Sequence, residues 1–437
     1  MHSLYLGLAK LFVHKRIDYI NFCSFLLILI IFGNLNGMFN YMFDIVAPLS
    51  PIILVLSVII IARLVYKNYE KESLLFWSFT AFYLIYLYIS SISYLLYNDL
   101  IFSGNNFLIT VRGYLSSIII LLSFYKLTTW ALANQDFYSL LSRMYIFLLL
   151  GVAVIFFSSV IGFNIGLDMD RASGFFANPN TAAGFILYCL CLTLCFAISE
   201  KKIFGFMYLL LVPALFYTMF ITFSKAGLIT FPIVVFAFLG MCLLRYRKLL
   251  KSKRKIFIWL FLSLILAIGV MSYYFSAIVD QLSWGQFLRL QRTLAFLSGE
   301  FTEATTSERS TLFNIGFQLI GEHPILGNGL TSFHAYDIPV NGKHIGVHNT
   351  FLLILGESGI LPFIMYSVLI LILIIKSWRL KNLAISFLFV SIMLVYVINI
   401  AGTGHNGLDD RVSNCLFGVM IGYFAYVDRD KIDNTKD

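Results

Sequence analysis

Long runs of uncharged apolar residues constrain this chain more than any other feature. The stretch "LLFWSFTAFYLIYLYISSISYLL", residues 74–96, contains no charged side chain. About 20 mainly apolar residues in a helix are enough to cross the hydrocarbon core of a bilayer. Because 60% of the 437 residues are hydrophobic and only 12% are charged, the sequence predicts a polytopic integral membrane protein.

We expect an all-α transmembrane bundle of about twelve spans that forms a single membrane domain over residues 1–437. The first span is expected to be retained, because the residues before it lack the pattern of a signal peptide. The loop 280–347 separates spans nine and ten, and a polar tail, 428–437, follows the last span. The predicted spans are 19–37, 46–65, 74–96, 107–125, 144–163, 181–199, 203–222, 226–244, 256–279, 349–375, 383–401 and 412–427.

Alternate loops of this topology divide the basic residues unequally. The side that holds both termini carries 23 of the 31 Lys and Arg residues. Cytoplasmic loops are enriched in positive charge, so we place both termini in the cytoplasm and the loop 280–347 outside it. The basic run Arg245–Lys255 is then a topological anchor that meets anionic lipid, and the net charge of +9 does not indicate nucleic-acid binding.

The extracytoplasmic loop 280–347 is amphipathic. Its segment "WGQFLRLQRTLAFL" mixes aromatic, leucine and arginine residues, which is typical of a helix that lies in the membrane interface. A capping box, Thr305 with Glu308, predicts a second helix that stops near Gly321 and Pro324. We therefore expect short amphipathic helices rather than a separate globular domain.

Basic residues on the outer face lie where helices begin. A cation at a helix N-terminus is disfavoured by roughly 0.3–1 kcal/mol unless an anion compensates. Helix N-termini and basic side chains together suit a phosphate or pyrophosphate, here one linked to a lipid. Each residue alone also fits an interface side chain that snorkels to water. The residues are Arg112, Arg171, Lys225, Arg309, His348 and Arg411.

Histidines near this face are candidates for proton transfer. His348 precedes an apolar run, and a neutral imidazole there could accept a proton from an attacking hydroxyl; a purely structural interface histidine is the alternative. His405, with Asp409 and Asp410, lies in a second outward loop and could orient a ring or bind a sugar hydroxyl; a polar loop that satisfies its own turns is the alternative. Glu357 is expected to bond to a neighbouring helix.

Metal and disulfide chemistry have no sequence signal. All six cysteines lie in apolar runs, without metal-ligand spacing, and no outward acidic cluster suits Mg²⁺. We expect no metal and no cofactor.

Four stretches in order resemble the bacterial O-antigen ligase and O-antigen polymerase superfamily of lipid-linked glycan transferases. They are "DRASGFFANPNTAAGF", "FSKAGL", "SERSTLFNIGFQLIGEHPILGNGLTSF" and "GVHNTFLLILGESGILPF", and the resemblance covers roughly Asp170 to Pro362. The resemblance implies a GT-C-like bundle whose long periplasmic loop contributes to metal-independent, inverting glycosyl transfer.

The resemblance also implies roles for particular residues. His348 matches the proposed catalytic base, and Arg309 matches an arginine that binds pyrophosphate. Arg171 matches an arginine before span six, and Lys225 falls where many members have arginine, so it keeps the charge but loses the bidentate fork. Supporting residues would be Arg112, His405, Arg411 and Asn349.

The sequence favours a polymerase within this superfamily. It would join undecaprenyl-pyrophosphate-linked repeat units at the periplasmic face of the bacterial inner membrane, with a second lipid-linked glycan as acceptor. A ligase, which transfers glycan to the lipid A core, is the alternative; Pro362, where the ligase pattern ends in glycine, disfavours it mildly. A transporter of lipid-linked oligosaccharide is a third class, and a chain-length regulator is implied only by resemblance.

Overall fold

The computed structural model describes most of the chain. It covers residues 19–43, 49–66, 73–97, 104–161, 171–176, 178–199, 202–245, 269, 273, 284–299, 309–333, 336–338, 343–402 and 407–433. His405, nearly all of the predicted span 256–279, the basic run after Arg245 and the capping box at Thr305 lie outside these residues.

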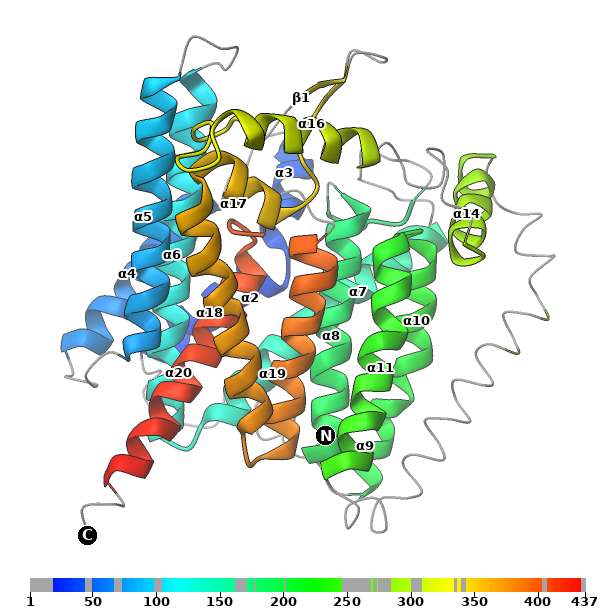
Figure 1. The fold of residues 1–437 in the computed structure, drawn as a ribbon. Coiled ribbons are helices and arrows are strands. Elements are labelled where there is room, and N and C mark those ends of the chain that lie inside the picture. Colours follow the sequence, from blue (N-terminus) through cyan, green and yellow to red (C-terminus); the bar gives the residue numbers. More distant parts are fainter. Residues whose placement is uncertain are drawn as a thin grey trace. The chain divides into compact units, whose positions relative to one another are not determined.

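Helices dominate the described residues, as predicted (Figure 1). A two-stranded antiparallel hairpin is formed by β1, Tyr336–Ile338, and β2, Lys343–Ile345, with Asp337 opposite His344. The helices are α2 (Tyr19–Phe32), α3 (Leu35–Phe43), α4 (Ser50–Tyr66), α5 (Leu74–Leu96), α6 (Gly104–Ala133), α7 (Phe137–Ile161), α8 (Pro179–Ser199), α9 (Lys202–Leu209), α10 (Leu211–Ile221), α11 (Lys225–Arg245), α14 (Trp284–Leu297), α16 (Arg309–Glu322), α17 (Thr350–Ser358), α18 (Ile360–Arg379), α19 (Leu383–Val395), the π-helix η1 (Tyr396–Ala401) and α20 (Arg411–Asp433).

Seven of the described helices are long and apolar enough to cross a membrane, and three shorter apolar helices accompany them. The chain is therefore a multi-pass membrane protein. The helix predicted over "WGQFLRLQRTLAFL" is confirmed, because α14 covers the same residues. The predicted span 203–222 is instead two helices, α9 and α10, which meet at Leu210.

The predicted span 349–375 is wrong, because the chain breaks at Gly359. Gly359 has a φ of +75°, a conformation that favours glycine. A Cβ there would lie 1.9 Å from the carbonyl oxygen of Ile325. The short helix α17 therefore ends before the spanning helix α18 begins.

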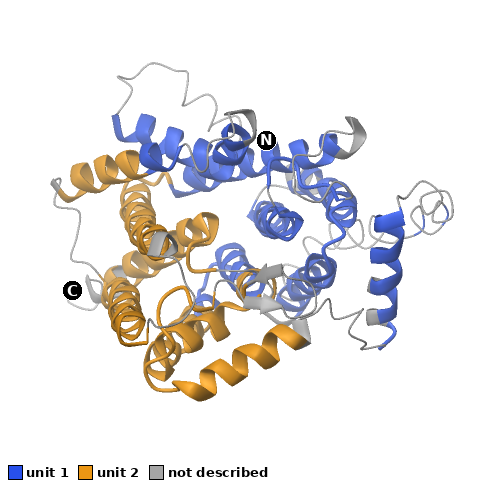
Figure 2. Ribbon diagram, turned by 90° about the horizontal axis from the view of Figure 1, so that it is seen from above, with its two compact units in different colours: residues 1–53, 137–300, 377–395 blue, residues 54–136, 301–376, 396–437 orange. Residues whose placement is uncertain are grey.

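The chain forms two compact units, each built from separate segments (Figure 2). Unit 1 contains residues 1–53, 137–300 and 377–395, and unit 2 contains residues 54–136, 301–376 and 396–437.

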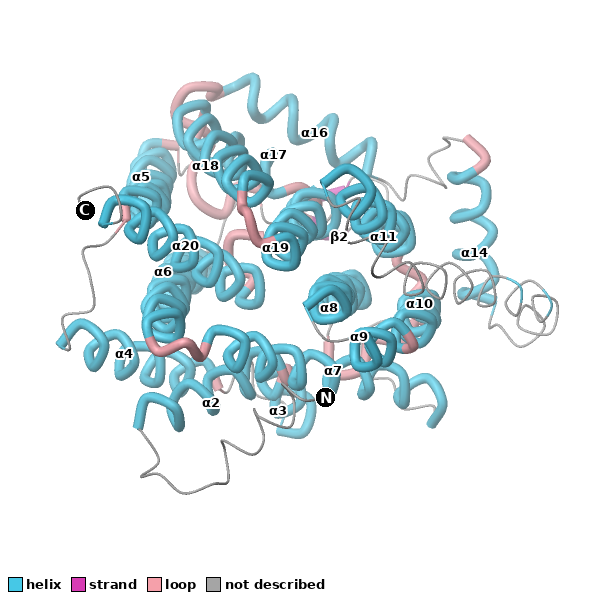
Figure 3. Tube along the Cα trace, turned by 90° about the horizontal axis from the view of Figure 1, so that it is seen from below, coloured by secondary structure: helices cyan, strands magenta, loops and turns pink. Residues whose placement is uncertain are grey.

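Unit 1 is built around α8. Nearly every side chain of this helix is buried, and Figure 3 shows α7, α9, α10, α11 and α19 around it. An apolar helix without a polar face is stable only in such surroundings. Asn178 accepts a hydrogen bond from the Asn180 amide at 2.8 Å, and Pro179 occupies the first helical position. Asparagine as a cap and proline at the first position are typical of a helix start.

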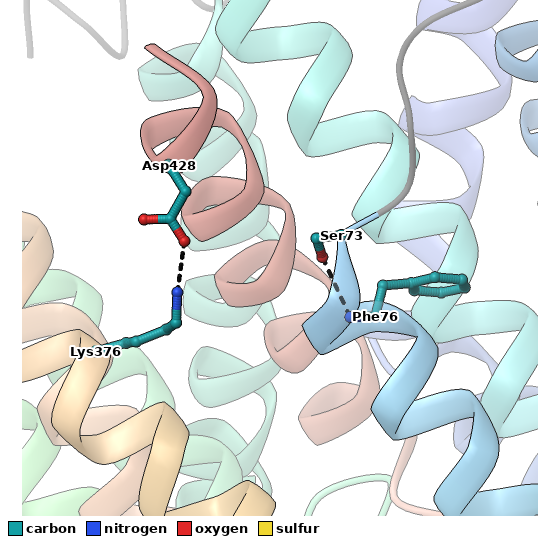
Figure 4. Close-up of polar contacts among 4 residues, drawn as sticks. All are labelled: Ser73, Phe76, Lys376 and Asp428. Atoms are coloured by element: carbon teal, nitrogen blue, oxygen red, sulfur yellow. Dashed lines mark hydrogen bonds and ion pairs between the residues drawn. The ribbon is translucent and has the colours of Figure 1, made fainter. Parts of the chain in front are cut away.

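Unit 2 is held together by the packing of α20 along α6. Gly418 and Gly422 on α20 permit close approach, because a Cβ at Gly418 would lie 2.5 Å from the carbonyl oxygen of Leu121. Lys376 and Asp428 form an ion pair at 2.5 Å, and Ser73 caps α5 by accepting from the Phe76 amide at 3.2 Å (Figure 4).

Candidate functional site

The predicted site residues fall into two groups, one in each unit. Arg171 and Lys225 belong to unit 1, whereas Arg309, His348, Arg112 and Arg411 belong to unit 2. Each group is described by itself.

Arg171 is the centre of a buried hydrogen-bond network in unit 1. Its side chain is only 7% exposed. Its Nε donates to the carbonyl oxygen of Thr222 at 2.7 Å, and its Nη2 donates to Oδ1 of Asn180 at 3.1 Å. The same Asn180 oxygen accepts from the Ser224 hydroxyl at 3.0 Å. The network therefore joins the loop before α8, the start of α8 and the turn between α10 and α11.

The turn between α10 and α11 presents Lys225 at a helix N-terminus. Ser224 precedes α11, and its Oγ accepts from the Gly227 amide at 3.3 Å. Phe223, inside the turn, has a φ of +49°, which is uncommon for a residue with a side chain. Lys225 is partly exposed and is the first residue of α11. The turn therefore places an ammonium group where the backbone N–H groups also attract an anion.

The unit 1 group brings together two of the stretches that carry the resemblance. Arg171 and Asn180 come from "DRASGFFANPNTAAGF", and Ser224 comes from "FSKAGL". The role of Asn180 was not predicted from the sequence, although an Asn-Pro-Asn segment before an apolar run is a signal for a helix start.

His348 of unit 2 lies between the hairpin and the start of α17. Its side chain is partly buried. The next residue, Asn349, caps α17 by accepting from the Leu352 amide at 3.0 Å, and its Nδ2 donates to the carbonyl oxygen of Gly402 at 3.5 Å. Asn349 was predicted as a supporting residue, and the structure shows how it fixes the backbone beside His348.

A second loop approaches the start of α17 from η1 and α20. The Gly407 amide donates to the Thr350 hydroxyl at 2.8 Å. The Tyr83 hydroxyl lies 2.9 Å from both the carbonyl oxygen of Leu408 and Oδ1 of Asn414. These contacts hold residues 407–410 beside the first residue of α17, although His405 itself is outside the described residues.

Charged residues gather where this second loop enters α20. Asp410 accepts from the Ser413 amide at 2.8 Å and from its hydroxyl, so it caps the helix. Burial raises the pKa of Asp410 above its usual value, and the Ser413 contacts oppose that rise. Arg411 opens α20 and interacts electrostatically with Asp409, Asp410 and Arg112.

Two predictions about helix starts have different outcomes in unit 2. Arg112 was expected to open a helix, but α6 begins at Gly104, so Arg112 lies about two turns inside it. Arg309, predicted in the first turn after the capping box, is the first described residue of α16, and the capping box itself lies outside the described residues. The loop that follows α16 is fixed to α17, because the Asn328 amide donates to the carbonyl oxygen of Gly356 at 2.7 Å. Figure 1 shows α16 running crosswise to α18.

Each group by itself suits chemistry carried by side chains, which is anion binding in unit 1 and acid–base or anion chemistry in unit 2. A partly buried histidine precedes a capped helix start, and basic residues open α11, α16 and α20. No group of three or more His, Cys, Asp or Glu that could hold a metal ion occurs among the described residues.

A family model described as O-antigen ligase matches residues 209–367. The match covers less than half of the chain and includes Lys225, Arg309 and His348. It confirms the resemblance to the O-antigen ligase and polymerase superfamily. No curated protein matches the chain. The match and the apolar helices together indicate a multi-pass membrane protein of surface-polysaccharide biosynthesis with O-antigen ligase-like activity.

Proposed function

We propose that this protein is a polysaccharide polymerase that joins undecaprenyl-pyrophosphate-linked repeat units. The observation that carries the proposal is His348, held beside the capped start of α17 within the residues that match the family. The two contacts of Asn349 fix the backbone beside this ring.

The reaction needs a base on the acceptor side. Neutral His348 takes the proton of an acceptor sugar hydroxyl as that oxygen forms a bond to the anomeric carbon of the donor. The bond between the anomeric carbon and the pyrophosphate oxygen breaks with its electron pair, so the configuration at that carbon is inverted. The products are the extended lipid-linked glycan and undecaprenyl pyrophosphate.

Negative charge develops on the departing pyrophosphate, and we propose that the basic residues stabilise it. Arg309 at the start of α16 and Lys225 at the start of α11 contribute positive charge together with helix N-termini. Arg171 adds a buried positive charge and supports the turn that precedes Lys225. This chemistry requires no metal.

Other residues take supporting roles in the proposal. Asn349 orients the backbone at His348, while Arg112, Arg411 and His405 contact the charged or hydroxyl groups of the substrates. The protein lies in the bacterial inner membrane as a GT-C-like bundle of about twelve spans. Its termini are cytoplasmic, its reaction is periplasmic, and a chain-length regulator is a partner.

A ligase is the second candidate, because the matching family is described as O-antigen ligase. The two functions differ in the acceptor, which is another lipid-linked glycan for a polymerase and the lipid A core for a ligase. A transporter of lipid-linked oligosaccharide would not need a base at position 348.

The test follows the lipopolysaccharide ladder and the lipid-linked glycan pool in a strain that lacks this protein. The strain is complemented with the wild-type chain, with His348→Ala, or with His344→Ala, a histidine on β2 that serves as the matched control. Single repeats on the lipid A core identify a polymerase, and long lipid-linked polymer that never reaches the core identifies a ligase. A full ladder with His348→Ala would refute the catalytic role of that ring.

A further inference from the structure

Glu357 is a buried carboxyl group that the reaction above does not use. It lies in the last turn of α17 and is 0% exposed. The Tyr86 hydroxyl of α5 donates to its Oε2, and the Phe333 backbone amide points to its Oε1 at 3.4 Å. Burial of a carboxyl group is costly unless its oxygens are hydrogen-bonded, so these two donors account for its presence in the interior of unit 2.

Phe333 connects Glu357 to the backbone that precedes His348. Its carbonyl oxygen accepts from the Val347 amide at 3.2 Å, and Val347 directly precedes His348. Its ring packs against Gly356, where a Cβ would lie 2.1 Å from the ring carbon Cζ. Phe333 is therefore held on one side by the last turn of α17, and it holds on the other side the backbone that enters His348.

The loop after α16 rests on the same turn of α17. The Asn328 amide donates to the carbonyl oxygen of Gly356 at 2.7 Å, and the Gly329 amide donates to that of Glu357 at 3.1 Å. The backbone of α17 thus binds the start of the segment 328–333, and the Glu357 side chain binds its end. Together they fix both ends of the segment 328–333, which precedes the hairpin.

We propose that Glu357 is a positioning residue for His348, acting through Phe333 and Val347. The inference rests on the proposed function, in which His348 is the base. A carboxyl group suits this task because its two oxygens can accept from two different donors at once, one on α5 and one on the segment that leads to His348. An apolar residue of the same length would fill the space but would leave the Phe333 amide without this acceptor.

The experiment compares Glu357→Ala and Glu357→Gln in the full-length protein, purified in detergent. The control is Tyr145→Phe, which removes one buried hydroxyl from unit 1. Amide hydrogen exchange at Val347 reports whether its hydrogen bond to the Phe333 carbonyl oxygen is formed, and it does not require activity. The kcat and KM are measured with lipid-linked repeat units extracted from the deletion strain.

Glu357→Ala should accelerate exchange at Val347 and lower kcat roughly 10- to 100-fold with little change in KM, because a displaced base slows the chemical step. Glu357→Gln should keep most of the protection at Val347 and most of kcat. Its amide oxygen can accept from Phe333 while its nitrogen donates to the Tyr86 oxygen. Tyr145→Phe should leave both unchanged.

Unchanged exchange at Val347 in Glu357→Ala would overturn the proposal, and so would faster exchange with an unchanged kcat. If Glu357→Ala fails to fold, Tyr86→Phe, which removes only one donor, should give a smaller change in the same direction; no change would again overturn it. An active His348→Ala enzyme would refute the base role of His348, and with it the positioning role of Glu357. Faster exchange at Val347 in Glu357→Ala would then show only that Glu357 fixes the backbone there.

Discussion

Replacement of Arg171 by lysine tests whether the network in unit 1 supports the turn that carries Lys225. The substitution keeps the positive charge but removes the planar fork that donates to Thr222 and Asn180 at once. A lysine ammonium group can reach at most one of the two acceptors in the same geometry. Stability of the turn should therefore fall even though the charge is retained.

The magnitude follows from the contacts that are lost. Hydrogen bonds made by charged groups contribute about 1.5–3 kcal/mol each, and the Arg171 contacts are 2.7 and 3.1 Å long. The turn also contains Phe223 at a φ of +49°, a conformation that costs roughly 1–2 kcal/mol. Loss of one contact should raise the opening equilibrium of the turn roughly 10- to 100-fold, since about 1.4 kcal/mol corresponds to a factor of ten.

The assay is amide hydrogen exchange at Gly227, whose amide is bonded to the Ser224 hydroxyl. Arg171→Lys, Asn180→Ala and the double variant form a thermodynamic cycle, and Arg63→Lys, at an exposed position, is the control. Because both single variants break the same contact, the double variant should lose less than the sum of the two. Additive losses would refute the reasoning, and so would unchanged exchange at Gly227 in Arg171→Lys.

Two further predictions concern unit 2. Gly359→Ala should destabilise the protein by at least 1–3 kcal/mol in thermal unfolding in detergent, because the new Cβ combines backbone strain with a clash against the Ile325 carbonyl; a wild-type melting temperature would contradict this. Asp410→Ala should cost about 0.5–2 kcal/mol through the lost cap, whereas Asp410→Asn keeps an acceptor for Ser413. Burial raises the pKa of Asp410, so ionisation of its carboxyl group lowers the stability of the folded state. This cost is complete above the pKa of the folded state and disappears as the pH falls towards the pKa of the unfolded state. Asp410→Asn should therefore remove a loss of stability that the wild type shows as the pH rises; equal pH profiles would contradict this.

The sequence predicted the membrane class, the helical fold and several helix boundaries. α5 covers the same residues as its predicted span, and α14 matches the predicted amphipathic helix. The turn between α10 and α11 lies within "TFSKAG", where two spans were expected to meet. These features are local, because the length and polarity of a run determine whether a helix can satisfy its backbone inside a membrane.

The candidate site was predictable only in part. Lys225 and Arg411 do begin helices, as their sequence positions indicated, whereas Arg112 does not. An Asn-Thr pair before an apolar run is a recognisable cap signal for the start of α17. The burial of Arg171 was not predictable, since its partners lie at positions 180 and 222 and only packing brings them together.

By itself, the sequence determined that this chain is a multi-pass helical membrane protein, because apolar run length and charge are properties of each segment alone. Only the tertiary structure decided that α17 ends at Gly359, that Glu357 pairs with Tyr86 and Phe333, and that Arg171 supports the turn before Lys225. The break at Gly359 depends on its φ of +75° and on the Ile325 carbonyl that packs against it. The other contacts join residues distant in sequence, and their free energy exists only when the folded backbone places donor beside acceptor.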